Sequence, residues 1–268
     1  MNGITLVISD IDGTLITSNH EVTDATLLVA AELRVRGIGL SLASSRPPRA
    51  VIPIAAELGL VSAFAAFNGA LIVTAQGKTL AEGTIPPTIT ARVKAVADEL
   101  DLDVWLYDLR DWWAGKRTAF VAREEHTSGL EAAFEGYAAQ LERSLNKLTV
   151  VGKPENVRKA EQRLKAELGD KISASRSKPR FLDITSFGWH KGSVVGRLAS
   201  LYAASPAQVA VIGDGPNDVE MFKEAGLSIA MGQAVDEVRS RARFVTASND
   251  DDGWAKGISK YVLGTDKL

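Results

Sequence analysis

Two clusters of acidic residues each follow a short apolar run of the chain. Residues 4–9 lead into Asp10-Ile11-Asp12-Gly13-Thr14, and residues 209–212 lead into Gly213-Asp214-Gly215-Pro216-Asn217-Asp218. Both apolar runs have the length and composition of a buried strand, and open α/β sheets bind ligands at the carboxyl ends of their strands. A single Asp-x-Asp-Gly could equally be a turn that closes a strand, but the second cluster favours a site that does chemistry.

Four carboxylates would converge at one sheet edge if these two strands were neighbours, namely those of Asp10, Asp12, Asp214 and Asp218. Like charges so close cannot all stay ionised without a counter-cation. The sequence has no cysteine and only three histidines, so a thiolate or histidine-rich metal site is not expected. Because an oxygen-only site that also meets a phosphate favours Mg²⁺ over Ca²⁺, we expect these four residues to form a magnesium site.

Donors suited to a phosphate occur at two comparable places. Ser44, Ser45 and Arg46 follow the apolar run 40–43 and offer hydroxyls, turn amides and a guanidinium where a helix begins. Serines before a helix are also common caps. Lys191 opens another helical segment, which is an unusual place for a cation because it meets the positive end of the helix dipole. A nearby anion would explain this lysine, although a solvated side chain is the simpler reading.

The elements around these residues predict two structural units. Up to about residue 83 and again from about 187, short apolar runs alternate with helical patterns, which predicts an α/β domain with a parallel sheet made of residues 1–83 and 187–268. Residues 84–186 predict an inserted α+β domain. Its helical stripes span 89–100, 130–145 and 157–168, and its strand-like runs are 104–107, 118–122, 148–151, 172–174 and 181–184.

Bulk composition excludes several classes of partner. The formal net charge is −2, which offers no general attraction to nucleic acid or to an anionic membrane. No apolar stretch approaches the roughly 20 residues of a membrane span, and the first ten residues lack the basic start and long apolar core of a signal peptide. We expect a cytoplasmic protein that is a monomer or weak homodimer.

Together the four chemical segments resemble, in order and spacing, the four motifs of the haloacid dehalogenase superfamily. The segments are residues 10–14, 42–47, 191–192 and 213–218. The long insertion, the segment 67–72 and the tail around residues 230–253 resemble the Cof-type subfamily with a type IIB cap. The chain departs from that pattern twice: Ser44 and Ser45 stand where threonine and glycine are usual, and Gln233 stands where asparagine commonly follows Met-Gly.

The resemblance implies a Rossmann-like core with an inserted C2B cap and a role for each motif. Asp10 would be the nucleophile and Asp12 the general acid and base. Magnesium would be held by the Asp10 carboxylate, the main-chain carbonyl of Asp12 and Asp214, with Asp218 in or near the coordination shell. Phosphate would be bound by Ser44, Ser45, Lys191 and Asn217, and the rest of the substrate by Arg46, Asn68 and Arg180.

The inserted domain would act as a lid that selects the substrate. Candidates for that role are Trp112, Trp113, Lys116, Arg123, His126 and Arg180, although packing or solvation is the commoner role for each type. The implied activity is a Mg²⁺-dependent phosphatase of a small phosphorylated metabolite, a sugar phosphate first. A phosphomutase of the phosphomannomutase type and a non-catalytic protein that accepts phosphate on Asp10 are the alternatives.

Overall fold

The computed structural model describes residues 3–265, which fold into a core and a cap. The core contains a parallel sheet of order β13-β12-β11-β1-β2. Its strands are β1 (Leu6–Ser9), β2 (Gly39–Leu42), β11 (Val209–Gly213), β12 (Leu227–Ala230) and β13 (Phe244–Val245). The central strands are continuous apolar runs because helices cover both faces of the sheet, as is usual for parallel sheets.

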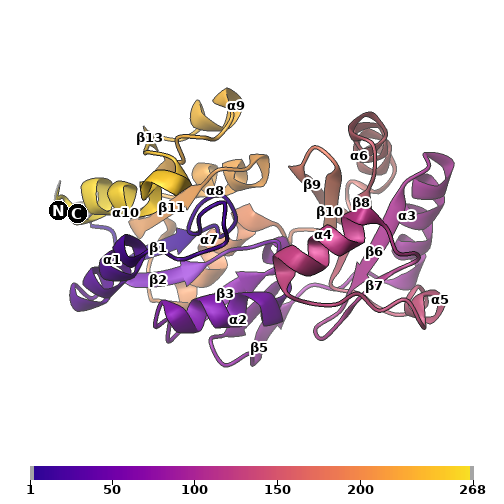
Figure 1. The fold of residues 1–268 in the computed structure, drawn as a ribbon, viewed down its shortest axis with the longest axis horizontal. Coiled ribbons are helices and arrows are strands. Elements are labelled where there is room, and N and C mark those ends of the chain that lie inside the picture. Colours follow the sequence, from indigo (N-terminus) through magenta and orange to yellow (C-terminus); the bar gives the residue numbers. More distant parts are fainter. Residues whose placement is uncertain (1–2, 266–268) are drawn as a thin grey trace.

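The core helices connect these strands and cover the sheet (Figure 1). They are α1 (Asp24–Val35), α2 (Pro48–Glu57), α7 (Lys191–Leu201), α8 (Val219–Glu224), α9 (Asp236–Arg239) and α10 (Gly253–Ile258). A small antiparallel sheet of β3 (Ala63–Ala66), β4 (Leu71–Thr74) and β5 (Thr79–Glu82) lies next to β2. Among the described residues, no helix is long and apolar enough to cross a lipid bilayer.

The cap is built on an antiparallel sheet of order β7-β6-β8-β10-β9. The strands are β6 (Asp103–Tyr107), β7 (Trp112–Ala114), β8 (Lys147–Val151), β9 (Ile172–Lys178) and β10 (Phe181–Ser186). Helices α3 (Pro87–Glu99) and α6 (Pro154–Leu168) cover the face away from the core, whereas α4 (Ala119–Ser128) lies on the side that faces the core (Figure 1). We propose 84–186 as the extent of this cap, because α3 begins at Pro87 and β10 ends at Ser186.

Strand alternation gives the cap sheet two different faces. Val104, Leu106, Leu148, Val150, Leu182 and Ile184 pack in the apolar cluster that includes α3 and α6. Because successive side chains of a strand point to opposite faces, the residues between them point toward the core. The expected α/β core with an inserted α+β unit is confirmed.

Two cap elements differ from the sequence prediction. Residues 118–122 were expected to form a strand, but they begin α4, because the Thr118 side chain caps its N-terminus and Gly129 ends it with a left-handed φ of 69°. The helix expected over 130–145 is wrong as well. Gly136 takes a φ of 77°, so only α5 (Tyr137–Gln140) is helical, and Leu145 instead bridges to Ile85.

Candidate active site

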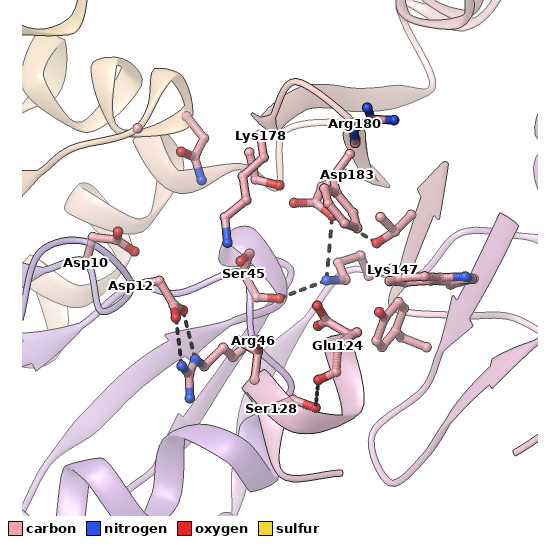
Figure 2. A pocket seen from close by; sticks show the side chains of 18 of the residues that line it. Asp10, Asp12, Ser45, Arg46, Glu124, Ser128, Lys147, Lys178, Arg180 and Asp183 are labelled. Carbon is pink, nitrogen blue, oxygen red and sulfur yellow. Dashed lines mark hydrogen bonds and ion pairs between the residues drawn. The ribbon is translucent and has the colours of Figure 1, made fainter. Parts of the chain in front are cut away.

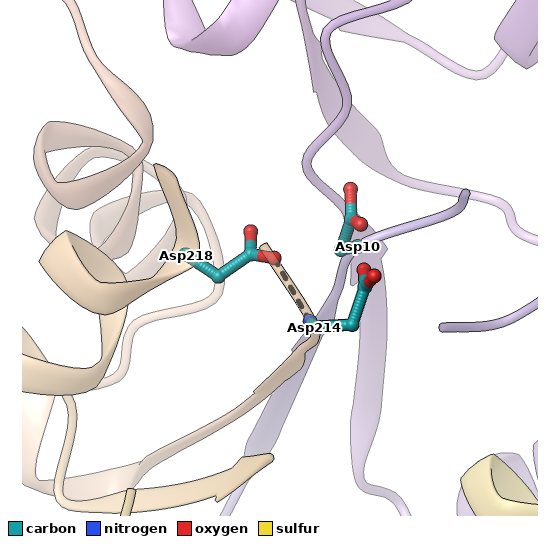
Figure 3. Close-up of side chains that lie close together, drawn as sticks. All are labelled: Asp10, Asp214 and Asp218. Carbon is teal, nitrogen blue, oxygen red and sulfur yellow. Dashed lines mark hydrogen bonds between the residues drawn. The ribbon is translucent and has the colours of Figure 1, made fainter. Parts of the chain in front are cut away.

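The two acidic clusters meet at the carboxyl ends of adjacent strands. β1 pairs in parallel with β11, and the Asp10 amide donates to the Ile212 carbonyl at 3.0 Å. Carboxylate oxygens of Asp10, Asp214 and Asp218 lie within 4.8 Å of one another (Figure 3). The long-range strand pairing therefore places three of the four predicted carboxylates in one cluster.

The turn after β1 is shaped to bring its residues close to Asp214. Gly13 has a φ of +76°, and a Cβ at this position would lie 2.5 Å from Asp214 Oδ2, so a side chain would both strain the backbone and collide with the carboxylate. Thr14 Oγ1 donates to Asp214 Oδ1 at 3.1 Å. Gln233 donates from Nε2 to the Gly13 carbonyl at 2.5 Å. The unusual Gln233 thus supports the turn that carries the catalytic candidates.

Lys191, at the start of α7, is the cation of this cluster. It is 2% exposed, and its Nζ lies 2.5 Å from Asp10 Oδ1 and 2.7 Å from Asp218 Oδ1. The other carboxylate oxygen of Asp218 accepts from the amides of Asp214 and Gly215 at 3.0 and 2.9 Å. Asp218 therefore holds the second loop together while it fixes the lysine.

One lysine does not neutralise three carboxylates, and the electrostatics reflect this. Burial, followed by the charge of Asp218, raises the pKa of Asp10 well above its ordinary value. Burial and Asp218 likewise raise the pKa of Asp214 to about 6. Burial opposes the charge of Lys191, but the neighbouring Asp10 and Asp218 outweigh it and raise the lysine pKa. The cluster has an excess of negative charge and an oxygen-only donor set, which fits a hard divalent cation.

The Asp12 side chain turns to a different partner. Arg46 donates from Nε to Asp12 Oδ2 at 2.8 Å and from Nη2 to Asp12 Oδ1 at 2.7 Å. Burial opposes ionisation of Asp12, but these hydrogen bonds and the charge of Arg46 prevail and lower its pKa. Arg46 is expected from the sequence to contact the substrate, but in this structure its guanidinium is bound to Asp12. The Asp12 carboxylate does not belong to the three-residue cluster.

The remaining predicted phosphate residues surround the same edge. Ser44 is fully buried and its Oγ accepts the Arg46 amide at 3.1 Å, whereas Ser45 lines the cavity described next. Asn217 lines it too, and its Nδ2 donates to Asn68 Oδ1 at 3.0 Å. Asn68 in turn donates to the cap residue Ser175 at 3.0 Å. Asn68 thus connects the core and the cap beside the site.

A cavity of about 320 Å³ lies between the core and the cap (Figure 2). Its core side includes Asp10, Asp12, Arg46, Lys191, Asp214 and Asn217. Of the cap candidates, Arg123 and Arg180 line it. Trp112 is instead buried against Tyr107, Trp113 belongs to the apolar cap core, Lys116 pairs with Asp103 at 3.0 Å, and His126 is exposed on α4.

Sequence reasoning missed several polar residues on the cap side of this cavity, namely Glu124, Lys147, Thr149, Lys178 and Asp183. Individually they carry no motif. Three of them alternate with core residues of β8 and β10, so the signal that could have found them is a polar residue at every second position of a buried strand.

Comparisons with known proteins agree with this arrangement. The sequence model of the haloacid dehalogenase-like hydrolase family matches residues 7–258. The chain is 31% identical over 252 residues to a Haemophilus influenzae protein whose name marks it as an inferred phosphatase, and the match covers 93% of this chain and 95% of that protein. It is 27% identical over 240 residues to the HMP-PP phosphatase of Serratia proteamaculans, with 86% and 85% covered.

A solved structure shows the same fold. The crystal structure of a haloacid dehalogenase-like hydrolase from Bacteroides thetaiotaomicron is similar to this chain with a TM-score of 0.83 and 27% identity, and the match covers 96% of this chain and 99% of that one. The family match spans both acidic clusters, Lys191 and the whole cap.

Proposed function

We propose that this chain, which belongs to the haloacid dehalogenase-like hydrolase family and is a phosphatase, removes phosphate from a small metabolite through an aspartyl-phosphate on Asp10 and depends on Mg²⁺. The observation that carries the proposal is the convergence of Asp10, Asp214, Asp218 and Lys191 at one sheet edge. The cavity in front of Asp10 has the size of a small-molecule site.

Asp10, Asp214 and Asp218, with the main-chain carbonyl of Asp12, would hold the metal ion. When bound, Mg²⁺ would neutralise the excess negative charge and screen the phosphoryl oxygens from the carboxylates. The chain's own groups perform the rest. Lys191 and Asn217 bind phosphoryl oxygens, and Lys191 also orients the Asp10 carboxylate. These fixed donors stabilise charge where it develops in the transition state.

Asp10 attacks phosphorus, so that a new oxygen–phosphorus bond forms as the bond to the leaving alkoxide breaks. Asp12 gives its proton to that alkoxide. In the second step Asp12 takes a proton from water, which attacks phosphorus and releases inorganic phosphate while Asp10 is regenerated. Before substrate binds, Arg46 holds Asp12 ionised. The arriving phosphate places negative charge beside Asp12 and favours its protonated form.

The relatives and the cavity support a substrate class. A relative is named as an HMP-PP phosphatase, and the cavity between core and cap has polar residues on both its core side and its cap side. We infer a small phosphorylated metabolite, with sugar phosphates as the first class to examine.

Phosphate release from p-nitrophenyl phosphate tests the proposal. We expect release that requires added Mg²⁺, that EDTA abolishes, and that Asp10→Asn lowers by at least about 10³-fold. Asp24→Asn, in the first turn of α1, is the matched control and should retain full activity. Brief incubation with substrate followed by acid quench should show a phosphate adduct on Asp10 by peptide mass spectrometry.

Metal-independent release, or full activity of Asp10→Asn, would contradict the proposal. A stable adduct on Asp10 without turnover would instead support a phosphate-accepting regulatory protein. Transfer of the phosphate to a second hydroxyl of a sugar phosphate, with no inorganic phosphate formed, would support a phosphomutase.

A further inference from the structure

The core-facing side of the cap sheet carries a polar row across two neighbouring strands. Asp183 on β10 lies opposite Thr149 on β8, and Thr149 Oγ1 donates to Asp183 Oδ1 at 2.9 Å. Lys147 Nζ lies 3.6 Å from the same oxygen. Each of these three residues is at most 4% exposed, and all three line the cavity. Lys147 and Asp183 are seen in Figure 2.

Donors among the described residues do not reach every carboxylate oxygen around this row. Lys147 donates to the Ser45 carbonyl at 2.8 Å, and its Nζ lies 4.2 Å from the Tyr107 ring centroid. Part of its capacity to donate hydrogen bonds to the carboxylates is therefore already used. Asp183 Oδ2 is buried and has no hydrogen-bond partner within residues 3–265. The Glu124 carboxylate lines the same cavity from α4, and no described residue donates to it.

Three carboxylate oxygens on the cap side of the cavity, Asp183 Oδ2 and both oxygens of Glu124, therefore lack a donor in the part of the chain that the structure describes. Buried acceptors in folded proteins are almost always paired, so Asp183 Oδ2 indicates a missing partner. The partly buried Glu124 carboxylate opens onto the same cavity and can accept from the same molecule. A carboxylate is an acceptor only, so the missing partner must be a donor. Because the phosphate end of a substrate belongs with Lys191 across the cavity, the donors must come from the other end of the molecule.

The same part of the cavity has an apolar wall formed by two aromatic rings. Trp105 and Phe181 both line the cavity, and their ring centroids are 5.7 Å apart with a tilt of 58°. Trp105 also pairs in register with Thr149, so the wall and the polar row are adjacent on one sheet face. A ligand here meets an apolar surface on one side and acceptors at its edge.

We propose that Glu124 and Asp183 recognise the leaving group by accepting hydrogen bonds from its hydroxyl or amino groups, while its apolar face packs on Trp105 and Phe181. This inference rests on the proposed phosphatase function. Lys147 is a positioning residue: it holds Asp183 and also binds the carbonyl of Ser45 in the phosphate loop. Recognition in the cap is thereby linked to the loop that meets the phosphate.

Selectivity between matched phosphate esters tests this assignment. Sorbitol 6-phosphate carries aliphatic hydroxyl donors, and pyridoxamine 5′-phosphate carries an aminomethyl group and a phenolic hydroxyl on a flat ring. By contrast, n-hexyl phosphate and p-nitrophenyl phosphate carry no donor on the leaving group. We expect wild-type kcat/KM to be higher for at least one donor-bearing ester than for n-hexyl phosphate. A preference for sorbitol 6-phosphate would indicate recognition of aliphatic hydroxyls, and a preference for pyridoxamine 5′-phosphate would indicate recognition of a flat ring that bears an amine and a phenolic hydroxyl.

Glu124→Gln is the main variant because Glu124 is only partly buried and the change preserves its size. We expect it to lower kcat/KM for the preferred donor-bearing ester by about 10- to 100-fold, as for loss of a charged hydrogen bond, with little change for p-nitrophenyl phosphate. Asp183→Asn should act in the same direction, because its amide nitrogen would take the place of Oδ2 while Oδ1 keeps the Thr149 hydroxyl. Glu142→Gln, an exposed cap carboxylate, is the control.

The possible outcomes distinguish the recognition role of Glu124 and Asp183 from the proposed phosphatase function. A wild-type enzyme that hydrolyses all four esters equally, or a Glu124→Gln enzyme that slows all four equally, would overturn the recognition role alone. Absence of any hydrolysis, p-nitrophenyl phosphate included, would overturn the proposed function and this inference with it.

Discussion

Arg46 donates two hydrogen bonds to the carboxylate of Asp12, at 2.7 and 2.8 Å, and so ties the loop after β2 to the turn after β1. The pair lowers the pKa of Asp12 after overcoming the effect of burial. An acid whose pKa is lower in the folded than in the unfolded chain stabilises the fold at pH values above its unfolded pKa. That contribution disappears as the pH falls through the folded pKa.

This pair predicts a pH-dependent loss of stability in Arg46→Met. At pH 7 we expect the variant to lose about 1–3 kcal/mol of unfolding free energy. The difference from wild type should shrink below pH 4, because the unfolded pKa of aspartate is about 3.9. Urea unfolding at pH 7 and pH 3.5 measures this. Arg49→Met removes an exposed ion pair with Asp111 and should be nearly neutral at both pH values. A pH-independent loss would mean that Arg46 acts mainly by packing.

The raised pKa of Asp214 predicts the opposite pH dependence of stability from that of Asp12. Burial and Asp218 raise its pKa to about 6, so its ionisation destabilises the fold as the pH rises from about 4 to 6. Without metal, Asp214→Asn should therefore raise the melting temperature at pH 7.5 by about 2–8 °C and leave it unchanged at pH 3.5. The asparagine can still accept the Thr14 hydroxyl through its side-chain carbonyl. Differential scanning fluorimetry in EDTA provides the comparison.

Addition of Mg²⁺ should reverse the order of the two melting temperatures, so that the wild type melts above Asp214→Asn. A ligand that binds only the folded state raises the melting temperature, so Mg²⁺ should stabilise the wild type at pH 7.5 and have a much smaller effect on Asp214→Asn. An equal response of both proteins would show that Asp214 is not a ligand. Asp236→Asn, exposed on α9, controls for a general effect of charge removal.

Asn68 predicts a link between phosphate binding and the cap. Its backbone has a φ of 59°, which glycine tolerates, so Asn68→Gly removes the bonds to Asn217 and Ser175 without backbone strain. We expect kcat/KM for p-nitrophenyl phosphate to fall about 3- to 10-fold. Ser175→Ala removes only the cap contact and should cost less. Equal losses in the two variants would indicate that Asn68 acts through the cap and not through Asn217.

The parts of the fold that the sequence predicts well are those set by local patterns. The apolar runs that become β1 and β11 are buried on both faces and end in acids, so both strand identity and the position of Asp10 and Asp214 follow from a few neighbouring residues. Residues 118–122 contain a short apolar run that suits either a strand or a helix. In this segment the Thr118 side chain caps the start of a helix and Gly129 ends it, so the segment forms α4.

What could not be predicted depends on distant elements coming together. From the sequence, the Arg46 guanidinium is expected to bind the phosphorylated substrate. Its pairing with Asp12 could not be predicted, because it depends on β2 lying beside β1. Lys147 and Asp183 look like ordinary polar residues of two strands. They acquire a role only because the cap sheet turns that face toward the core (Figure 1), and no local pattern encodes the orientation of one unit against the other.

The hydrogen bonds of Gln233 predict that this chain needs glutamine here, which is one methylene longer than the usual asparagine. Its Nε2 donates to the Gly13 carbonyl at 2.5 Å, and its Oε1 accepts the Asn249 amide at 3.2 Å, so it joins the Asp10 turn to the C-terminal segment. Gln233→Asn should be too short to reach both partners and should lower the melting temperature by about 2–4 °C, equivalent to roughly one hydrogen bond. Because a Cβ on Gly13 would collide with Asp214, even a small shift of this turn would disturb that carboxylate, and kcat should fall as well. Gln140→Asn, a partly buried residue of α5 whose side chain accepts only a solvent-exposed hydrogen bond from Arg143 among the described residues, should change neither quantity. Unchanged melting and kinetics in Gln233→Asn would show that the Gly13 turn holds its shape without this side chain.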